Sequence, residues 1–387
     1  MPGYSNYQDA GALRYRRRRT IPGRLIWLLV LLVLLVGLGW GVYSFIKANP
    51  LDNSLQVKVL RAGEAWVPLG SGIVSMDGYT MSALDDQGIV LWNLTLPLTG
   101  TLQVSADHQL IGIHNQQSFA LINPSGDLLY YQDFPTGIER FQTGSTMVAL
   151  QSQDADGRFI QVYKNDATAV ETLRFPLRRI LDYGFYQGDQ LWVLLMDDNA
   201  VSPSCRVSTY NPGVSLTGMI FVPNQLVYKV LVTAQKEVVA IGSQSVVCYD
   251  AVGKRQEELS ITGWTIQDAW VNGADIWLLL AQSKEYEDFS ILRSIRLTAK
   301  TAKNTTEVYY DISDEILTLP VAAHKIRGSI NGNRLYILNE GGLDVMKGKK
   351  LEQSLPMDRA ADMFINMDRR LLYIPYTGGV ARMGLPK

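Results

Sequence analysis

An uninterrupted apolar segment, residues 25–46, constrains this chain more than any other feature, because it contains no charged residue. A helix rises about 1.5 Å per residue, so a helix of this length spans the roughly 30 Å hydrocarbon core of a bilayer. Such a helix satisfies its own backbone hydrogen bonds within lipid. The arginines of residues 14–24 precede it, and cationic flanks stay in the cytoplasm. The segment therefore predicts a transmembrane signal anchor; a cleaved signal peptide and a buried core helix are the alternatives.

This anchor divides the chain into four predicted parts. Residues 1–24 are a disordered, basic cytoplasmic tail, residues 25–46 the transmembrane helix, residues 47–54 a linker, and residues 55–387 an extracytoplasmic domain. The formal net charge of the chain is −1 although its tail is strongly basic, so the outer domain is acidic. An acidic domain lacks the electrostatic footprint of a nucleic-acid-binding protein. We therefore expect a single-pass protein of the cell membrane that does not bind nucleic acid.

The outer domain repeats one turn pattern. Short runs rich in β-branched and aromatic residues alternate with clusters of Gly, Asn, Asp and Pro, which is typical of β-strands joined by tight turns. Such turns require the positive φ that glycine adopts without strain. The clearest turn markers end at Gly88, Gly126, Gly213 and Gly253, and weaker ones follow at residues 163–166, near Thr301, at Gly348 and at Gly384. Their mean spacing of about 42 residues indicates a repeat array.

Each repeat divides into four strands, which is the pattern of a β-propeller blade. In the second repeat these strands are residues 102–106, 109–114, 118–123 and 127–134. The eighth repeat ends before its fourth strand, and a spare strand-like segment, residues 55–60, stands before the first. Pairing the two closes the ring and removes an open edge. The sequence therefore predicts an all-β, eight-bladed β-propeller with an N-terminal closing strand after one transmembrane α-helix; seven blades is the alternative.

One repeat carries a recognisable motif. Ala83, Asp85, Gly88 and Trp92 fill the places of A-x-D-x-x-G-x-x-x-W, so this segment resembles the repeat of quinoprotein-like (PQQ-like) propellers. In such a repeat a tight glycine turn joins two strands and the tryptophan packs against the adjacent blade. The order of basic tail, single span and outer propeller is similar to that of uncharacterised membrane-anchored propeller proteins of Gram-positive bacteria. This resemblance implies a location in the bacterial envelope and implies no reaction.

Residues that would support catalysis or metal binding do not form a recognisable pattern. The three histidines of the chain are scattered, and no nucleophile elbow or phosphate-binding loop occurs. Residues 152–163 echo a calcium loop, but Tyr163 stands where the bidentate glutamate is needed, so a plain hairpin is favoured. Cys205 and Cys248 lie in strand-like runs, which favours buried thiols over a disulfide. We therefore predict no catalytic residue, no cofactor and no metal.

The function favoured by the sequence is a non-catalytic binding or scaffolding module of the cell envelope, with a protein or envelope polymer as partner. The longest insertions, residues 196–206 and 281–293, both follow the second strand of their repeat, so we expect them at one end of the ring. The predicted partner-contact residues are Lys284, Glu285, Tyr286, Glu287 and Asp288. The alternative is a propeller enzyme, either a quinone-dependent dehydrogenase or a carboxylate-based lyase or hydrolase, that uses the central funnel.

Overall fold

The computed structural model describes residues 57–63, 65–98, 100–107, 109–197, 202–282, 288–301, 308–357, 360, 362–366, 368–376 and 379–385. The predicted tail, transmembrane helix and linker therefore lie outside the described residues. In the part that is described, no helix has the length and apolarity needed to cross a membrane.

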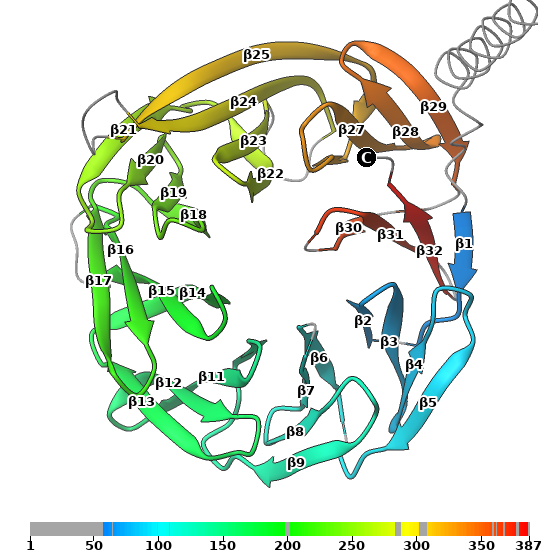
Figure 1. The fold of residues 1–387 in the computed structure, drawn as a ribbon, viewed down its shortest axis with the longest axis vertical. Helices are drawn as coiled ribbons and strands as arrows, with labels where there is room; N and C mark the ends of the chain where they lie inside the picture. Colours follow the sequence, from blue (N-terminus) through cyan, green and yellow to red (C-terminus); the bar gives the residue numbers. More distant parts are fainter. Residues whose placement is uncertain are drawn as a thin grey trace, which may run out of the picture. The chain divides into compact units, whose positions relative to one another are not determined.

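Eight four-stranded antiparallel sheets follow one another around a ring (Figure 1). We number these blades in chain order. Blade 1 contains β2 (Ala65–Leu69), β3 (Gly72–Asp77), β4 (Thr80–Leu84) and β5 (Val90–Thr95). Blade 2 contains β6 (Gln103–Ala106), β7 (Ile111–His114), β8 (Ser118–Ile122) and β9 (Leu128–Asp133). Blade 3 contains β10 (Arg140–Thr143), β11 (Met147–Asp154), β12 (Gly157–Lys164) and β13 (Ala169–Phe175). Blade 4 contains β14 (Arg178–Tyr186), β15 (Gln190–Asp197), β16 (Cys205–Asn211) and β17 (Ser215–Val222).

The second half of the ring has the same organisation. Blade 5 contains β18 (Val227–Val232), β19 (Val238–Gly242), β20 (Ser245–Tyr249) and β21 (Arg255–Ser260). Blade 6 contains β22 (Thr265–Asn272), β23 (Asp275–Ala281), β24 (Phe289–Thr301) and β25 (Val308–Ala323). Blade 7 contains β26 (Lys325–Gly328), β27 (Arg334–Asn339), β28 (Gly342–Lys347) and β29 (Lys350–Pro356). Blade 8 contains β30 (Phe364–Ile365), β31 (Leu371–Tyr376), β32 (Gly379–Gly384) and, as its fourth strand, β1 (Val57–Leu60).

The ring closes through its N-terminal strand, as predicted. β1 pairs antiparallel with β32, in a register that places Val57 opposite Met383 and Leu60 opposite Val380. Leu60 is buried among residues of blades 8 and 1, so the closing strand also contributes to the core at that junction. The blade count is therefore eight, and the seven-bladed alternative is wrong.

The turn markers lie between the third and fourth strands of their blades. Asp85 shows how such a turn is held, because its Oδ1 accepts hydrogen bonds from the backbone N–H groups of Gln87 (2.8 Å) and Ile89 (2.9 Å). Gly88 completes this turn with a φ of 80°. The pairing register of the third and fourth strands shifts beside this turn, between Ala83 and Leu84 of the third strand. Blades 2, 3, 4, 5 and 7 carry a register shift at the same place. The sequence repeat is thus a repeat of one hairpin geometry.

The tryptophan of the motif packs against the next blade, as expected from the resemblance. Trp92 Nε1 donates a hydrogen bond of 2.9 Å to the Pro124 carbonyl in the turn of blade 2. A Cβ added to Gly126 of that turn would lie 2.6 Å from the Trp92 ring, so only glycine leaves the indole enough room. Glu171 makes the corresponding link from blade 3, where its Oε2 accepts a 2.9 Å bond from Gly213 N of blade 4.

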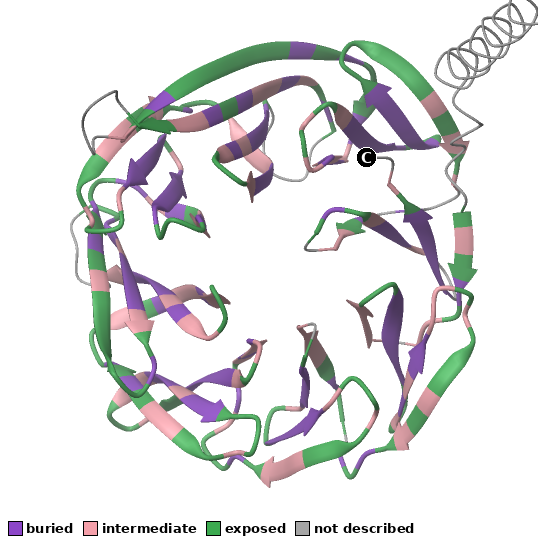
Figure 2. Cartoon of the chain, in the orientation of Figure 1, coloured by how far each residue is buried: buried purple, intermediate pink, exposed green. Residues whose placement is uncertain are grey.

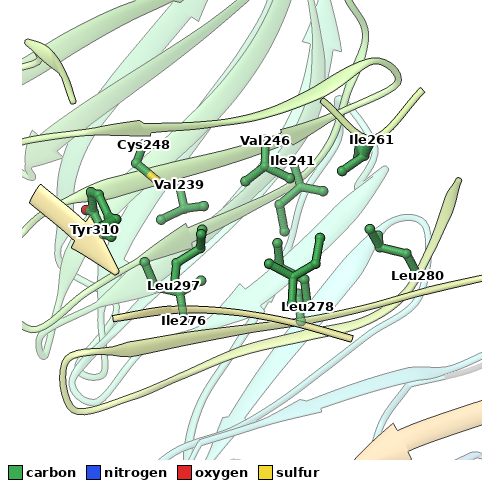
Figure 3. Close-up of a cluster of buried hydrophobic side chains, with 12 residues drawn as sticks. Val239, Ile241, Val246, Cys248, Ile261, Ile276, Leu278, Leu280, Leu297 and Tyr310 are labelled. Carbon is green, nitrogen blue, oxygen red and sulfur yellow. The ribbon is translucent and has the colours of Figure 1, made fainter. Parts of the chain in front are cut away.

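The core consists of a buried apolar cluster at each junction between adjacent blades. Figure 2 shows that the middle strands of the blades are mostly buried, whereas the outermost strands alternate with exposed residues. Figure 3 shows the junction of blades 5 and 6, where Val239 and Ile241 of β19 face Ile276 and Leu278 of β23. The apolar second strands predicted from the sequence are apolar because each blade buries both of its faces.

Two further sequence interpretations are confirmed. Cys205 and Cys248 are free, buried thiols, and burial raises the pKa of Cys248 to about 12. The calcium-like string is a hairpin between β11 and β12, in which Asp154 accepts a hydrogen bond from Asp156 N and pairs with Arg174 at 2.9 Å. Both carboxylate oxygens of Asp154 are therefore engaged by protein groups.

Candidate functional site: one face of the ring

Strand order divides the propeller into two distinct faces. The first strand of each blade is innermost, and the chain then runs antiparallel toward the outside (Figure 1). The turns between second and third strands therefore emerge at the same end of the ring as the connections between blades. We call this end the loop face. The turns between first and second strands, and between third and fourth strands, emerge at the opposite face.

The strand ends that flank both predicted long insertions lie at the loop face, because one insertion joins β15 to β16 and the other joins β23 to β24. Of the predicted contact residues, Lys284, Glu285, Tyr286 and Glu287 lie outside the described residues. Asp288 is described, and it is exposed immediately before the buried Phe289 that begins β24. The structure thus places one predicted contact residue on this face and leaves the contact itself a prediction.

A polar cavity of about 830 Å³ opens on the loop face between blades 2 and 3. Its walls come from the connections into blades 2 and 3 and from the second-to-third turns of the same blades. Side-chain amides dominate its lining, together with one carboxylate and one imidazole: Gln103, His114, Asn115, Gln116, Gln117, Glu139 and Gln153. Amides both donate and accept hydrogen bonds, so such a lining suits a polar ligand or a peptide backbone.

The imidazole of this cavity is held in one orientation. His114 stacks on Phe141, with ring centroids 5.4 Å apart and an interplanar angle of 16°. Its Nδ1 donates to the Asn115 carbonyl over 2.9 Å. Burial lowers the pKa of His114, and the bond to Asn115 offsets this effect only in part. His114 is therefore a neutral hydrogen-bonding group at pH 7.

Cations gather where the central channel opens on the loop face. Every Lys and Arg of the eight innermost strands occupies one of the first three positions of its strand: Arg140 of β10, Arg178 and Arg179 of β14, Lys229 of β18, and Lys325 and Arg327 of β26. Since first strands start at the loop face, the four residues in first or second positions lie at that end of the channel, and Lys229 and Arg327 lie deeper. We call this group the cationic mouth.

Carboxylates neutralise part of the cationic mouth. Arg140 pairs with Asp182 of the next blade at 2.7 Å, and Arg178 pairs with Asp197 at 2.8 Å. Lys325 pairs with Asp362 at 3.1 Å. These pairs are partly exposed to solvent, so each contributes no more than about 1 kcal/mol to stability.

Bulges in the innermost strands supply further partners for these cations. Register shifts in β14 and β22 leave one extra residue on each strand, namely Leu181 and Gln267. The Leu181 carbonyl accepts a 3.1 Å bond from Arg140, and the Gln267 carbonyl accepts a 2.8 Å bond from Arg327. A bulged residue lies outside the strand ladder, so its carbonyl is available to a neighbouring blade.

A buried ion pair links blades 6, 7 and 8 within the ring, and its arginine comes from the first-to-second turn of blade 8. Arg369 donates to both carboxylate oxygens of Asp268, at 2.9 and 3.1 Å, and to the Gly328 carbonyl at 2.8 Å. The guanidinium carbon lies 4.0 Å from the centroid of the Trp270 ring. Burial acts to raise the pKa of Asp268, but the bonds and charge of Arg369, with the charge of Arg327, outweigh burial and lower it. Asp268 is therefore ionised at pH 7.

The other end of the channel has a different character. A cavity of about 290 Å³ lies there, at the ends of the innermost strands of blades 1, 2 and 8. Its lining is mainly apolar and includes Val67, Leu69, Val104 and Ile365. The two cavities thus differ in chemistry, since amides dominate the lining of the one on the loop face and apolar residues that of the other.

Groups of three or more His, Cys, Asp or Glu side chains arranged to hold a metal ion are absent from the described residues. Asp182, Asp197, Asp268 and Asp362 are each paired with an arginine or lysine, and Glu139 accepts a hydrogen bond from Gln151.

Three solved structures are similar to this fold at very low sequence identity. BamB from Moraxella catarrhalis aligns over 86% of this chain and 100% of its own, with a TM-score of 0.50 and 10% identity. A eukaryotic initiation factor aligns over 86% of both chains, with a TM-score of 0.54 and 11% identity. The WD40 domain of SCAP from fission yeast aligns over 85% of this chain and 94% of its own, with a TM-score of 0.58 and 9% identity.

No protein-family model and no curated protein sequence matches this chain. At 9–11% identity the three structures establish the fold alone. The β-propeller is therefore shown, and the WD40-like description applies at the level of architecture.

The cationic mouth and the buried pair of Asp268 and Arg369 were not predicted from the sequence. A signal for the mouth was present, because basic residues begin the first strands of blades 3, 4 and 7. It appears only when the repeats are aligned by strand and position. The charge of the domain as a whole obscures it, since the domain is acidic on average.

Proposed function

We propose that this chain is a non-catalytic binding or scaffolding module of the cell envelope, held at the membrane by residues 25–46. In this proposal its N-terminus is cytoplasmic, its propeller is extracytoplasmic, and its loop face contacts a protein or envelope-polymer partner. Membrane attachment and orientation rest on the charge-free segment and the arginines that precede it.

The observation that supports the binding face is the convergence of three features on one end of the ring. The connections flanking both long insertions, the amide-lined cavity and the cationic mouth all lie on the loop face. Loops held on a rigid scaffold are where binding residues concentrate in proteins. A partner that contacts this face therefore meets charged, hydrogen-bonding and loop surfaces together.

An affinity pull-down from native membranes tests this proposal. The tagged full-length protein is solubilised gently, and co-purifying proteins are quantified by mass spectrometry. A variant that reverses the charge of Glu285, Glu287 and Asp288 is expected to lose the enriched partner. Asp311→Lys is the matched control, because Asp311 is an exposed aspartate of the same blade near the opposite face. Equal enrichment from the triple variant and the wild type would contradict the assignment of this loop.

A further inference from the structure

Two cations of the mouth have only neutral partners within the described residues. Lys229 Nζ donates to the Ala269 carbonyl at 2.9 Å, and Arg327 donates to the carbonyls of Gln267 and Ile326 at 2.8 and 3.3 Å. Neither makes an ion pair with a described carboxylate, whereas Arg140, Arg178 and Lys325 each do. These two residues are therefore the surplus positive charge of the mouth.

The two surplus cations approach the same short stretch of backbone from opposite sides. Lys229 comes from blade 5 and Arg327 from blade 7, and both reach β22 of blade 6 between them. Their carbonyl acceptors, on Gln267 and Ala269, are two residues apart, which spans at most about 7 Å of strand. Both cationic heads therefore lie beside one short stretch of β22, where an oxyanion can accept charge-assisted N–H···O bonds of about 2.8 Å from them.

The local charge balance favours an anion at this point. Asp268 is the neighbouring carboxylate, and Arg369 already binds both of its oxygens. Partial burial lowers the pKa of Lys229, the charge of Asp268 opposes this effect, and the positive charges of Arg369 and Arg327 add to it. The cations around Lys229 thus repel one another, and an added negative charge relieves that repulsion.

The position in the channel identifies the kind of ligand that can enter. Lys229 and Arg327 are the third residues of β18 and β26, so they lie two residues, or roughly 7 Å, from the loop-face ends of these strands. A flat protein surface cannot reach that depth, whereas a side chain or chain end of an extended segment can. The three neighbouring cations Arg140, Arg178 and Lys325 are each balanced by a carboxylate, so the unbalanced positive charge of Lys229 and Arg327 is what attracts a negative group into the mouth.

We propose that Lys229 and Arg327 form an oxyanion site in the channel mouth that binds a carboxylate of an acidic peptide segment. This inference deepens the proposed function, because it names the chemistry of the partner segment that the loop face receives. The amide-lined cavity between blades 2 and 3 lies on the same face and is available to the polar backbone of such a segment.

Fluorescence anisotropy with a labelled tetraglutamate peptide and the full-length protein tests the site. Tetraglutamate is expected to bind in low salt and to weaken as salt rises, while tetraglutamine does not bind. Lys229→Met keeps the aliphatic stem and Arg327→Gln keeps one donor for the Gln267 carbonyl, so both variants are designed to fold. Each is expected to weaken tetraglutamate binding at least tenfold.

Lys300→Met is the matched control for total charge. Lys300 lies near the end of β24 on the opposite face, where it pairs with Asp311. This variant removes one positive charge and is expected to bind tetraglutamate within twofold of the wild type. Equal weakening by Lys300→Met and Lys229→Met would overturn the site, because it would reduce the effect to net charge.

Inorganic phosphate distinguishes a peptide ligand from a free oxyanion. Phosphate is expected to compete with tetraglutamate only at millimolar concentration, since it engages the two cations without other contacts. Competition at micromolar phosphate would overturn the assignment to a peptide. Failure of tetraglutamate to bind while the loop-dependent pull-down partner is retained would overturn this inference and leave the proposed function standing.

Discussion

Replacement of Arg369 by leucine offers the sharpest test of how the ring is held together. The side chains of Arg369 and Asp268 are only 7% and 5% exposed, and they come from blades 8 and 6. Arg369 adopts a φ of 52°, in the left-handed region that non-glycine residues rarely occupy. Arg369→Leu removes three hydrogen bonds and leaves Asp268 as a buried carboxylate without its main partner.

The expected loss of stability follows from that unpaired charge. Removing one partner of a buried ion pair costs about 3–5 kcal/mol, because the remaining charge stays desolvated. In the wild type the folded-state pKa of Asp268 is lowered, so the pair stabilises the protein above the unfolded pKa and loses this effect as pH falls through the folded value. In Arg369→Leu, burial instead raises the pKa of Asp268. The loss of unfolding free energy in Arg369→Leu, relative to the wild type, is therefore largest at pH 7 and becomes smaller toward pH 4.

Urea unfolding of the full-length protein at pH 7 and pH 5, followed by tryptophan fluorescence, measures this deficit. Arg370→Leu is the matched control, since the neighbouring arginine is 71% exposed and its substitution is expected to change stability by less than about 0.5 kcal/mol. The double variant Arg369→Leu with Asp268→Asn is expected to recover part of the loss. A deficit below about 1 kcal/mol, or one equal at both pH values, would refute the reasoning.

Three further outcomes follow from the packing of the blades. Trp92→Ala removes the hydrogen bond to Pro124 and the contact with the turn of blade 2, so we expect the unfolding free energy measured in urea to fall by about 2–3 kcal/mol. An unchanged unfolding midpoint would contradict the role of Trp92 in joining blades 1 and 2. Leu278→Ala, at a fully buried position, is expected to cost about 2–5 kcal/mol, whereas Leu177→Ala, 71% exposed, should stay within about 0.5 kcal/mol. Cys205 and Cys248 are buried, and burial raises the pKa of both thiols, so we expect them to react with a thiol reagent at pH 8 only after unfolding. Fast labelling of the folded protein would contradict their burial.

The regular part of the fold could be predicted because each blade repeats local signals. Glycine markers such as Gly88 locate the third-to-fourth turns, and the spare strand-like segment at residues 55–60 predicted the closing strand, which is observed at Val57–Leu60. These features depend on residues that are near one another in sequence, or on the number of strands in each repeat. A repeat also supplies several independent instances of the same pattern.

The unpredicted features depend on contacts between blades. Asp268 and Arg369 are 101 residues apart, and no local pattern brings them together. Lys229 and Arg327 become neighbours only because blade 6 lies between their blades and a bulge exposes the Gln267 carbonyl. The unusual length of β24 and β25 in blade 6 was likewise not foreseen, since the marker near Thr301 is weak and gives no strand length.

Site-specific photo-crosslinking in native membranes tests the central claim, that the loop face is the binding face, most directly. A benzophenone amino acid is placed at Gln116, an exposed residue of a second-to-third turn beside the amide-lined cavity, and separately at Val252, 88% exposed in a third-to-fourth turn. The account predicts a discrete crosslinked partner from Gln116 and none from Val252. Crosslinking from Val252 with none from Gln116 would contradict it.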